Sequence, residues 1–181
     1  MIGSAVALVA ALAQGGSCVP SDPKSDARRP DWYCDLLAAA GQTRLAGAPA
    51  FRFAYVPAFH APRVITVVGG PERPVVEGIL LNGAGCCSPG QVVVKRNRRL
   101  LTDAEWKLLQ QRLDNAGIWE PTEYDPAGVD GAVWLLEGRR GLQHRVHSKF
   151  SPESRQWPQY YRACTYLLEL AGLLPRSNEL Y

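Results

Sequence analysis

Residues 132–149 read AVWLLEGRRGLQHRVHSK. Two runs that contain branched and aromatic side chains flank the central Gly138-Arg139-Arg140-Gly141. Short runs of this kind, separated by a glycine-bounded turn, are typical of a β-hairpin. We therefore expect strands over residues 132–137 and 142–149, with Gly138 opposite Gly141.

One face of this hairpin is predicted to hold a polar pair. Side chains alternate along a strand, so Glu137 and His144 share a face and are diagonal neighbours within side-chain reach. The same face carries apolar residues, namely Val133, Leu135, Leu142 and Val146. We expect a structural hydrogen-bonded pair, and a general acid–base pair is the alternative. For a structural pair, His144→Leu should destabilise the fold more than Glu137→Gln, because an amide still accepts a bond from the imidazole.

The opposite face of the hairpin is a candidate binding surface. It carries Trp134, Arg145 and His147, and the predicted register opposes Trp134 to Arg145, which permits a cation–π contact. Arg139 and Arg140 extend the surface at the turn. In the alternative interpretation a helix covers Trp134, and Arg145 reaches past it to solvent.

Further strands and helices are expected on both sides of the hairpin. Turn sequences rich in Gly, Pro and Asn separate β-prone runs at residues 51–56, 64–68, 75–81 and 91–96. Helices are expected over residues 32–40, from a capping box at Thr102-Asp103-Ala104-Glu105 to Gly117, and over residues 158–171. This order predicts an α+β fold: a mostly antiparallel sheet, meander plus hairpin, with two main helices packed on one face.

The organisation of the chain follows from its length and composition. A chain of 181 residues, 46% hydrophobic and 20% charged, is expected to form one domain, which we place at residues 31–175. Residues 176–181 are expected to be a C-terminal tail. Residues 14–30 have the proline-containing composition of a flexible tether.

The first residues resemble a secretory signal. No charged residue precedes Asp22, residues 5–13 are small or aliphatic, and Ala11 and Ala13 have the small side chains that a signal peptidase requires. We expect a signal peptide over residues 1–13 and export to the periplasm or cell envelope. Cys18 is a candidate lipidation site, which would be the chain's one link to a membrane, and an apolar helix packed on the core is the alternative for this segment.

The hairpin also supports a family resemblance. The sequence resembles a family of small uncharacterised exported bacterial proteins with the pattern D-G-x-x-W-x-L-E-G, then G-x-x-H, then S-P. The matching residues here are Asp130-Gly131, Trp134, Leu136-Glu137-Gly138, Gly141 to His144, and Ser151-Pro152. The similarity covers roughly residues 50 to 175. It implies one domain and a bacterial origin, and it implies no particular chemistry.

Cysteines in an exported domain favour disulfides over a reactive thiol. Apart from Cys18, the candidates are Cys34, Cys86, Cys87 and Cys164. Adjacent cysteines rarely bond to each other, so Cys86 and Cys87 would each pair with Cys34 or Cys164. Cys164 lies on the apolar face of the last predicted helix, where a free buried thiol is the alternative.

Other site classes lack their sequence signals. No C-x₂-C or H-x₃-H spacing indicates zinc, and no glycine-rich phosphate-binding motif indicates a nucleotide, so we expect no metal and no cofactor. A net charge of +3 does not indicate nucleic-acid binding. The basic run at residues 95–99 is expected to be a solvated loop, and docking of an acidic protein, a phospholipid head group or a nucleic acid is its functional alternative.

These observations favour a non-catalytic, exported module that binds another macromolecule, in the manner of an inhibitor or an immunity protein. The partner is expected to be another protein. A small hydrolase that uses Cys86 or Cys87 with His60 or His144 is one alternative. A structural lipoprotein anchored at Cys18 is another.

The signal sequence leads to a direct prediction. We expect the mature chain to begin at Gln14, because cleavage after Ala13 places small residues at both positions that the peptidase recognises. Intact-mass measurement of the protein from an envelope fraction checks this. A soluble cytoplasmic protein that retains Met1 would contradict it.

Overall fold

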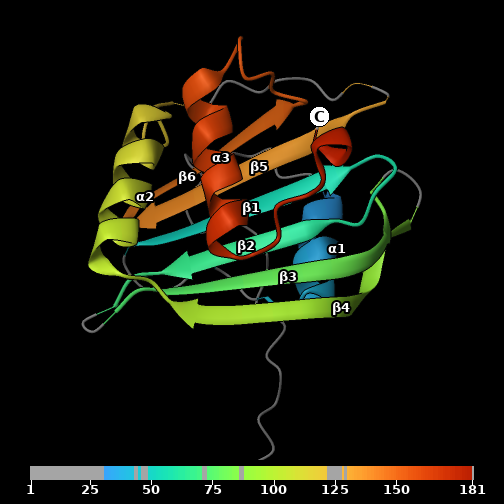
Figure 1. The fold of residues 1–181 in the computed structure, drawn as a ribbon, viewed down its shortest axis with the longest axis horizontal. Helices are drawn as coiled ribbons and strands as arrows, with labels where there is room; N and C mark the ends of the chain where they lie inside the picture. Colours follow the sequence, from blue (N-terminus) through green and yellow to red (C-terminus); the bar gives the residue numbers. More distant parts are fainter. Residues whose placement is uncertain are drawn as a thin grey trace, which may run out of the picture.

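A computed structural model describes residues 31–42, 45, 49–70, 73–85, 88–121, 128 and 130–180. The predicted signal peptide, tether, Cys18, Cys86 and Cys87 lie outside these residues. The described part contains a six-stranded antiparallel sheet in the order β4-β3-β2-β1-β5-β6. The expected α+β class is confirmed, and Figure 1 shows the sheet with α2 and α3 on its near side.

The meander and the hairpin join in the middle of the sheet. The strands of the meander are β1 (Ala50–Pro57), β2 (Arg63–Val68), β3 (Val75–Ala84) and β4 (Ser88–Leu100). The hairpin strands are β5 (Ala132–Arg140) and β6 (Gln143–Phe150), and β5 pairs with β1. Every residue of β1 is therefore buried, because helices cover both faces of this central strand.

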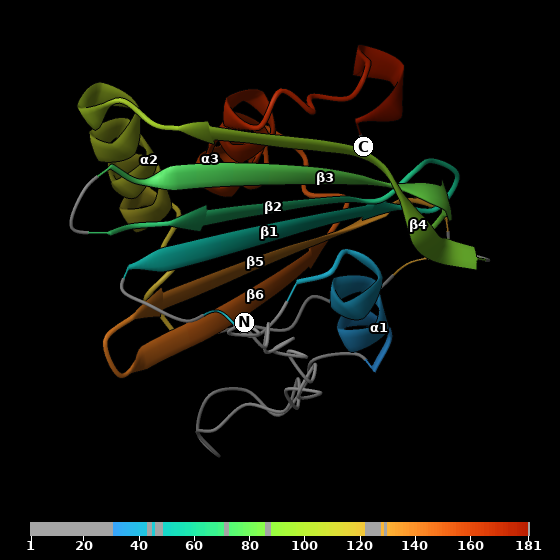
Figure 2. The ribbon, with the colours of Figure 1, turned by 90° about the horizontal axis from the view of Figure 1, so that it is seen from below.

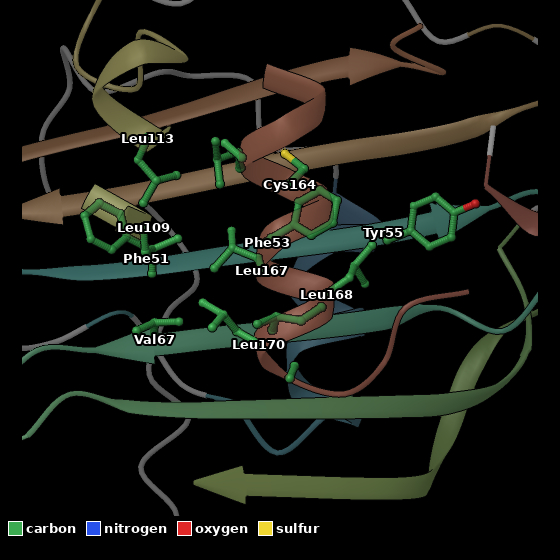
Figure 3. Close-up of a cluster of buried hydrophobic side chains, with 14 of the residues drawn as sticks. Phe51, Phe53, Tyr55, Val67, Leu109, Leu113, Cys164, Leu167, Leu168 and Leu170 are labelled. Carbon is green, nitrogen blue, oxygen red and sulfur yellow. The ribbon is translucent and has the colours of Figure 1, made fainter. Parts of the chain in front are cut away.

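Two helices cover one face, as expected, and the third covers the other. Figure 2 shows α2 (Asp103–Asn115) and α3 (Pro158–Leu170) on one side of the sheet and α1 (Asp31–Ala39) on the opposite side. In Figure 3, Leu109 and Leu113 of α2 and Leu167 and Leu168 of α3 lie over the aromatic residues of β1. A smaller apolar cluster under α1 includes Tyr33, Leu36 and Leu135. No helix in the described part of the chain is long and apolar enough to cross a membrane.

The hairpin register differs from the expected one by four residues, because the turn lies two residues further along the chain. Arg140 pairs with Gln143, so Gly138 lies opposite Arg145 and not opposite Gly141. A two-residue hairpin turn needs a positive φ at its first residue, and Gly141 provides it at +58°. The expected turn would have given this conformation to an arginine. As a result Leu142 sits in the turn, 97% exposed, and not on the apolar face of the hairpin.

The basic run at residues 95–99 belongs to β4, so its assignment to a loop is wrong. Successive side chains of this edge strand point to opposite faces of the sheet, and both sets form hydrogen bonds or ion pairs with neighbouring elements. Asn97 Nδ2 donates to the Ala171 carbonyl at 2.9 Å and Arg99 Nε donates to the Leu170 carbonyl at 3.0 Å, at the end of α3. Arg96 reaches the other face and pairs with Glu77. These contacts outweigh the weak strand preference of a charged run.

The residues expected to form a C-terminal tail contain a short 3-10 turn, η1 (Ser177–Glu179). The Tyr55 hydroxyl donates to the Glu179 carbonyl, and Arg63 pairs with the Glu179 carboxylate at 3.1 Å. Glu179, which follows the predicted end of the domain at residue 175, therefore contacts residues of β1 and β2.

The capping box of α2 is confirmed. Thr102 Oγ1 accepts the backbone N–H of Glu105, and Glu105 accepts the backbone N–H of Thr102. A hydrogen bond from Arg99, together with the bonds from Thr102, lowers the pKa of Glu105 to about 2. The carboxylate thus stays charged and able to cap the helix well below neutral pH.

We predict that Thr102→Ala destabilises the protein by about 1 kcal/mol, because the first turn of α2 loses its side-chain acceptor. Urea denaturation of both proteins measures the difference. Thr165→Ala, which removes a hydroxyl from within α3, is the comparison expected to show a smaller loss. An unchanged midpoint for Thr102→Ala would contradict the capping role.

Candidate functional site: a polar row across the sheet and its open groove

Polar side chains form a continuous row across the α1 face of the sheet. Cross-strand partners are Glu137 on β5, Arg52 on β1, Thr66 on β2, Glu77 on β3 and Arg98 on β4. We call these five residues the polar row. Apart from the basic edge strand β4, the strands that it crosses are mainly apolar, so each buried member of the row needs a hydrogen-bonding partner.

The first end of the polar row is fully buried around the Glu137 carboxylate. Glu137 is 0% exposed, yet three side chains reach it. Tyr33 of α1 donates its hydroxyl at 2.9 Å, Arg52 Nη1 lies at 3.4 Å, and His144 Nε2 lies at 2.8 Å from the other carboxylate oxygen. Because the carboxylate oxygens accept, the imidazole donates through Nε2.

The predicted hydrogen-bonded pair is therefore confirmed, and it belongs to a larger cluster. The four-residue change of register left Glu137 and His144 on one face, because faces repeat every two residues. Arg52 and Tyr33 were missed, since they come from distant parts of the chain. The sequence signal for Arg52 is a single charge inside the buried, aromatic strand AFRFAYVP.

The middle of the polar row is tied to the end of α1. Arg52 Nε donates to Thr66 Oγ1 at 3.2 Å, and Thr66 donates to Gln42 Oε1 at 3.1 Å. Gln42 Nε2 in turn donates to Glu77. Gly41, with φ +64°, ends the helix: its N–H bonds to Ala38 and that of Gln42 bonds to Leu37. This left-handed turn directs Gln42 onto the sheet.

Beyond Gln42 the polar row opens into a groove. The groove has a volume of about 370 Å³ and is lined by Gln42, Thr66, Val68, Gly69, Gly70, Arg73, Val75, Glu77 and Arg98. Its carboxylate, Glu77, is neutralised by Arg96 at 2.8 Å and also accepts from Gln42. Arg73 and Arg98 are exposed, and neither pairs with a carboxylate among the described residues. Glu72, next to Arg73 in sequence, lies outside those residues.

Trp134 does not form a binding surface. It is 0% exposed, stacks on Tyr161 of α3 at 5.4 Å and contacts the rings of Phe53 and Tyr55. Its cross-strand partner is Lys149, not Arg145. The expectation of an exposed Trp134 opposed to Arg145 is therefore wrong, and the alternative of a helix over the tryptophan is the one observed.

The other predicted binding residues lie around the hairpin. Arg139 donates to the Leu45 carbonyl at 3.4 Å, Arg140 stacks over Trp119 at 4.4 Å, and Arg145 donates to the His144 carbonyl at 3.2 Å. None of these three arginines pairs with a carboxylate in the described part of the chain. His147 donates to the Ile118 carbonyl at 2.9 Å and lines a separate hollow of about 350 Å³ beside α3.

The cysteines divide into two groups. Cys164 is a free thiol, buried under α3, and burial raises its pKa well above the ordinary value. The suggested disulfide at Cys164 is therefore wrong, because the apolar core encloses the sulfur. Cys34 lies on α1, and it is not bonded to Cys164, the other described cysteine.

The arrangement offers little for the hydrolase alternative. His144 is held in the buried cluster with Glu137, and Cys86 and Cys87 lie outside the described residues. His60 lies in the described loop between β1 and β2. Across the described ranges, no three His, Cys, Asp or Glu side chains come together as a metal site.

Comparison with known proteins adds no further constraint on the site. No protein-family model and no curated protein matches the sequence.

With Arg52 and Tyr33 bound to Glu137, we now expect Glu137→Gln to destabilise the protein more than His144→Leu, which is the reverse of the order expected from the pair alone. Glu137→Gln leaves the 2% exposed Arg52 without its counter-charge, which should destabilise the protein by about 3–5 kcal/mol. His144→Leu leaves Glu137 with Arg52 and Tyr33 and should cost about 1–3 kcal/mol. Urea denaturation measures both.

A double variant tests the cause of this order. Because Arg52→Met removes the charge that Glu137→Gln would strand, the two changes together should cost less than the sum of the single variants. If His144→Leu lowers the free energy of unfolding more than Glu137→Gln does, then Glu137 is not the group that neutralises the charge of Arg52.

Proposed function

We propose that this chain is an exported, non-catalytic module that binds an acidic protein, in the manner of an inhibitor or an immunity protein. The apolar segment at residues 5–13 with Ala11 and Ala13 supports export to the periplasm or envelope. The observation that carries the binding role is a set of arginines at one end of the sheet, the basic margin: Arg73, Arg98, Arg139, Arg140 and Arg145.

Strand register supports a common location for the basic margin. Arg139 pairs with Ala50, Ala50 with Val68, and Val68 with Val75, so the hairpin tip and the Arg73 loop belong to the same end of the sheet. Arg98 lies one strand further, two residues from the partner of Val75. Four strand spacings separate β5 from β4, or about 19 Å. This width favours a macromolecule over a small ligand.

The charges of the basic margin support an acidic partner. No carboxylate in the described part of the chain pairs with these five arginines, whereas Arg52, Arg63, Arg96 and Arg99 all have such a partner. Complementary charge mainly raises the rate and specificity of association. With a net charge of only +3, the chain lacks the strongly basic character common in nucleic-acid-binding domains.

We expect photo-crosslinking from position 142 in cells to capture one envelope protein. Leu142 is 97% exposed in the hairpin turn, so replacing it with a photoreactive residue leaves the core intact. Arg139→Gln with Arg140→Gln should abolish capture, because two charges of the basic margin are lost. Arg155→Gln with Arg162→Gln makes the same charge change on exposed residues elsewhere and should retain it.

Two further measurements complete this test. The captured protein should be acidic, and its binding to the purified full chain should weaken as salt rises. Equal capture by both double variants, or binding of an RNA or DNA duplex with comparable affinity, would overturn the proposal. Thermal unfolding shows whether the variants remain folded.

A further inference from the structure

The groove at the open end of the polar row differs from the rest of the basic margin. The hairpin arginines stack on a ring or bond to backbone carbonyls. Arg73 and Arg98 instead flank a hollow whose carboxylate is already neutralised by Arg96. We propose that this groove is a carboxylate-binding subsite that receives a glutamate side chain of the acidic partner. This inference rests on the proposed function and names the group that the site recognises.

The charge of the groove favours an anion with a single negative charge. Glu77 keeps both oxygens engaged, one with Arg96 and one with Gln42, so it leaves Arg73 and Arg98 free of competition from within the groove. A guanidinium group can hold a carboxylate through two parallel hydrogen bonds. Repulsion from Glu77 would be stronger for a doubly charged phosphate than for a carboxylate.

The shape of the groove favours a carboxylate on a short aliphatic stem. Val68 and Val75 line it beside the arginines, so methylene groups can pack there while the charged end meets the guanidinium groups. Gly70 adds no side chain to the lining, and a Cβ at this position would meet no atom within 4 Å. The volume of about 370 Å³ lies within the range of small-ligand sites and accommodates one side chain rather than a folded element.

The test uses a blocked glutamate, acetylated and methylamidated, so that its side chain carries the only charge. Titration into the full chain is followed by NMR at the backbone amides of Gly69, Gly70 and Val75. We expect saturable shifts in the millimolar range, and binding of blocked glutamine weaker by about tenfold, since the amide cannot replace the charged acceptor.

Variants separate the groove from general electrostatics. Arg98→Gln and Arg73→Gln should each weaken binding of blocked glutamate several-fold, and Arg155→Gln should leave it unchanged. Gly70→Leu changes no charge but adds a bulky side chain to the lining, so it should also abolish binding. Retained binding in Gly70→Leu would overturn the groove as the site. Tighter binding of inorganic phosphate at equal ionic strength would overturn the carboxylate assignment.

The outcome of this experiment is independent of the outcome of the photo-crosslinking test. If position 142 captures an acidic partner but the groove does not bind blocked glutamate, the inference falls and the proposed function stands. If the groove binds blocked glutamate but no partner is captured, the proposed function falls, and with it the assignment of the glutamate to a protein partner.

Discussion

Burial of the Glu137 carboxylate is the constraint on which the α1 face of the sheet depends. A charge with no exposure to solvent is tolerated only when charged and hydrogen-bonding partners surround it. Tyr33, Arg52 and His144 come from α1, β1 and β6, so satisfying this one group positions a helix and two strands relative to β5. The surrounding apolar contacts supply most of the driving force for packing, while the polar contacts select one arrangement.

The polar row carries this arrangement from the buried end of the sheet to its edge. Each step is a hydrogen bond or ion pair between neighbouring elements, from Arg52 through Thr66 and Gln42 to Glu77 and Arg96. Because Glu77 is occupied by these contacts, the last arginine of the row, Arg98, faces the groove without a carboxylate among the described residues. A structural network at one end thus leaves a groove lined by arginines at the other.

Local patterns predicted most of the fold because they depend on neighbouring residues. The capping box at Thr102 and Glu105 and the alternation along the hairpin both act over a few positions. The assignment of Glu137 and His144 to one face was also correct, since an error of four residues in register does not change faces. The basic run of β4 and the exposure of Trp134 were predicted wrongly, because contacts with α3 decide both.

The sequence by itself determined the fold class, the helix ends and the polar pair of the hairpin. Only the tertiary structure decided that Arg52 would neutralise Glu137, that Arg98 would reach a groove beside Arg73, and that Cys164 would be enclosed by the core. The physical reason is sequence distance: 85 residues separate Arg52 from Glu137, and no local preference encodes their meeting. Strand pairing across β1 and β5 brings them together, and burial then requires that they interact.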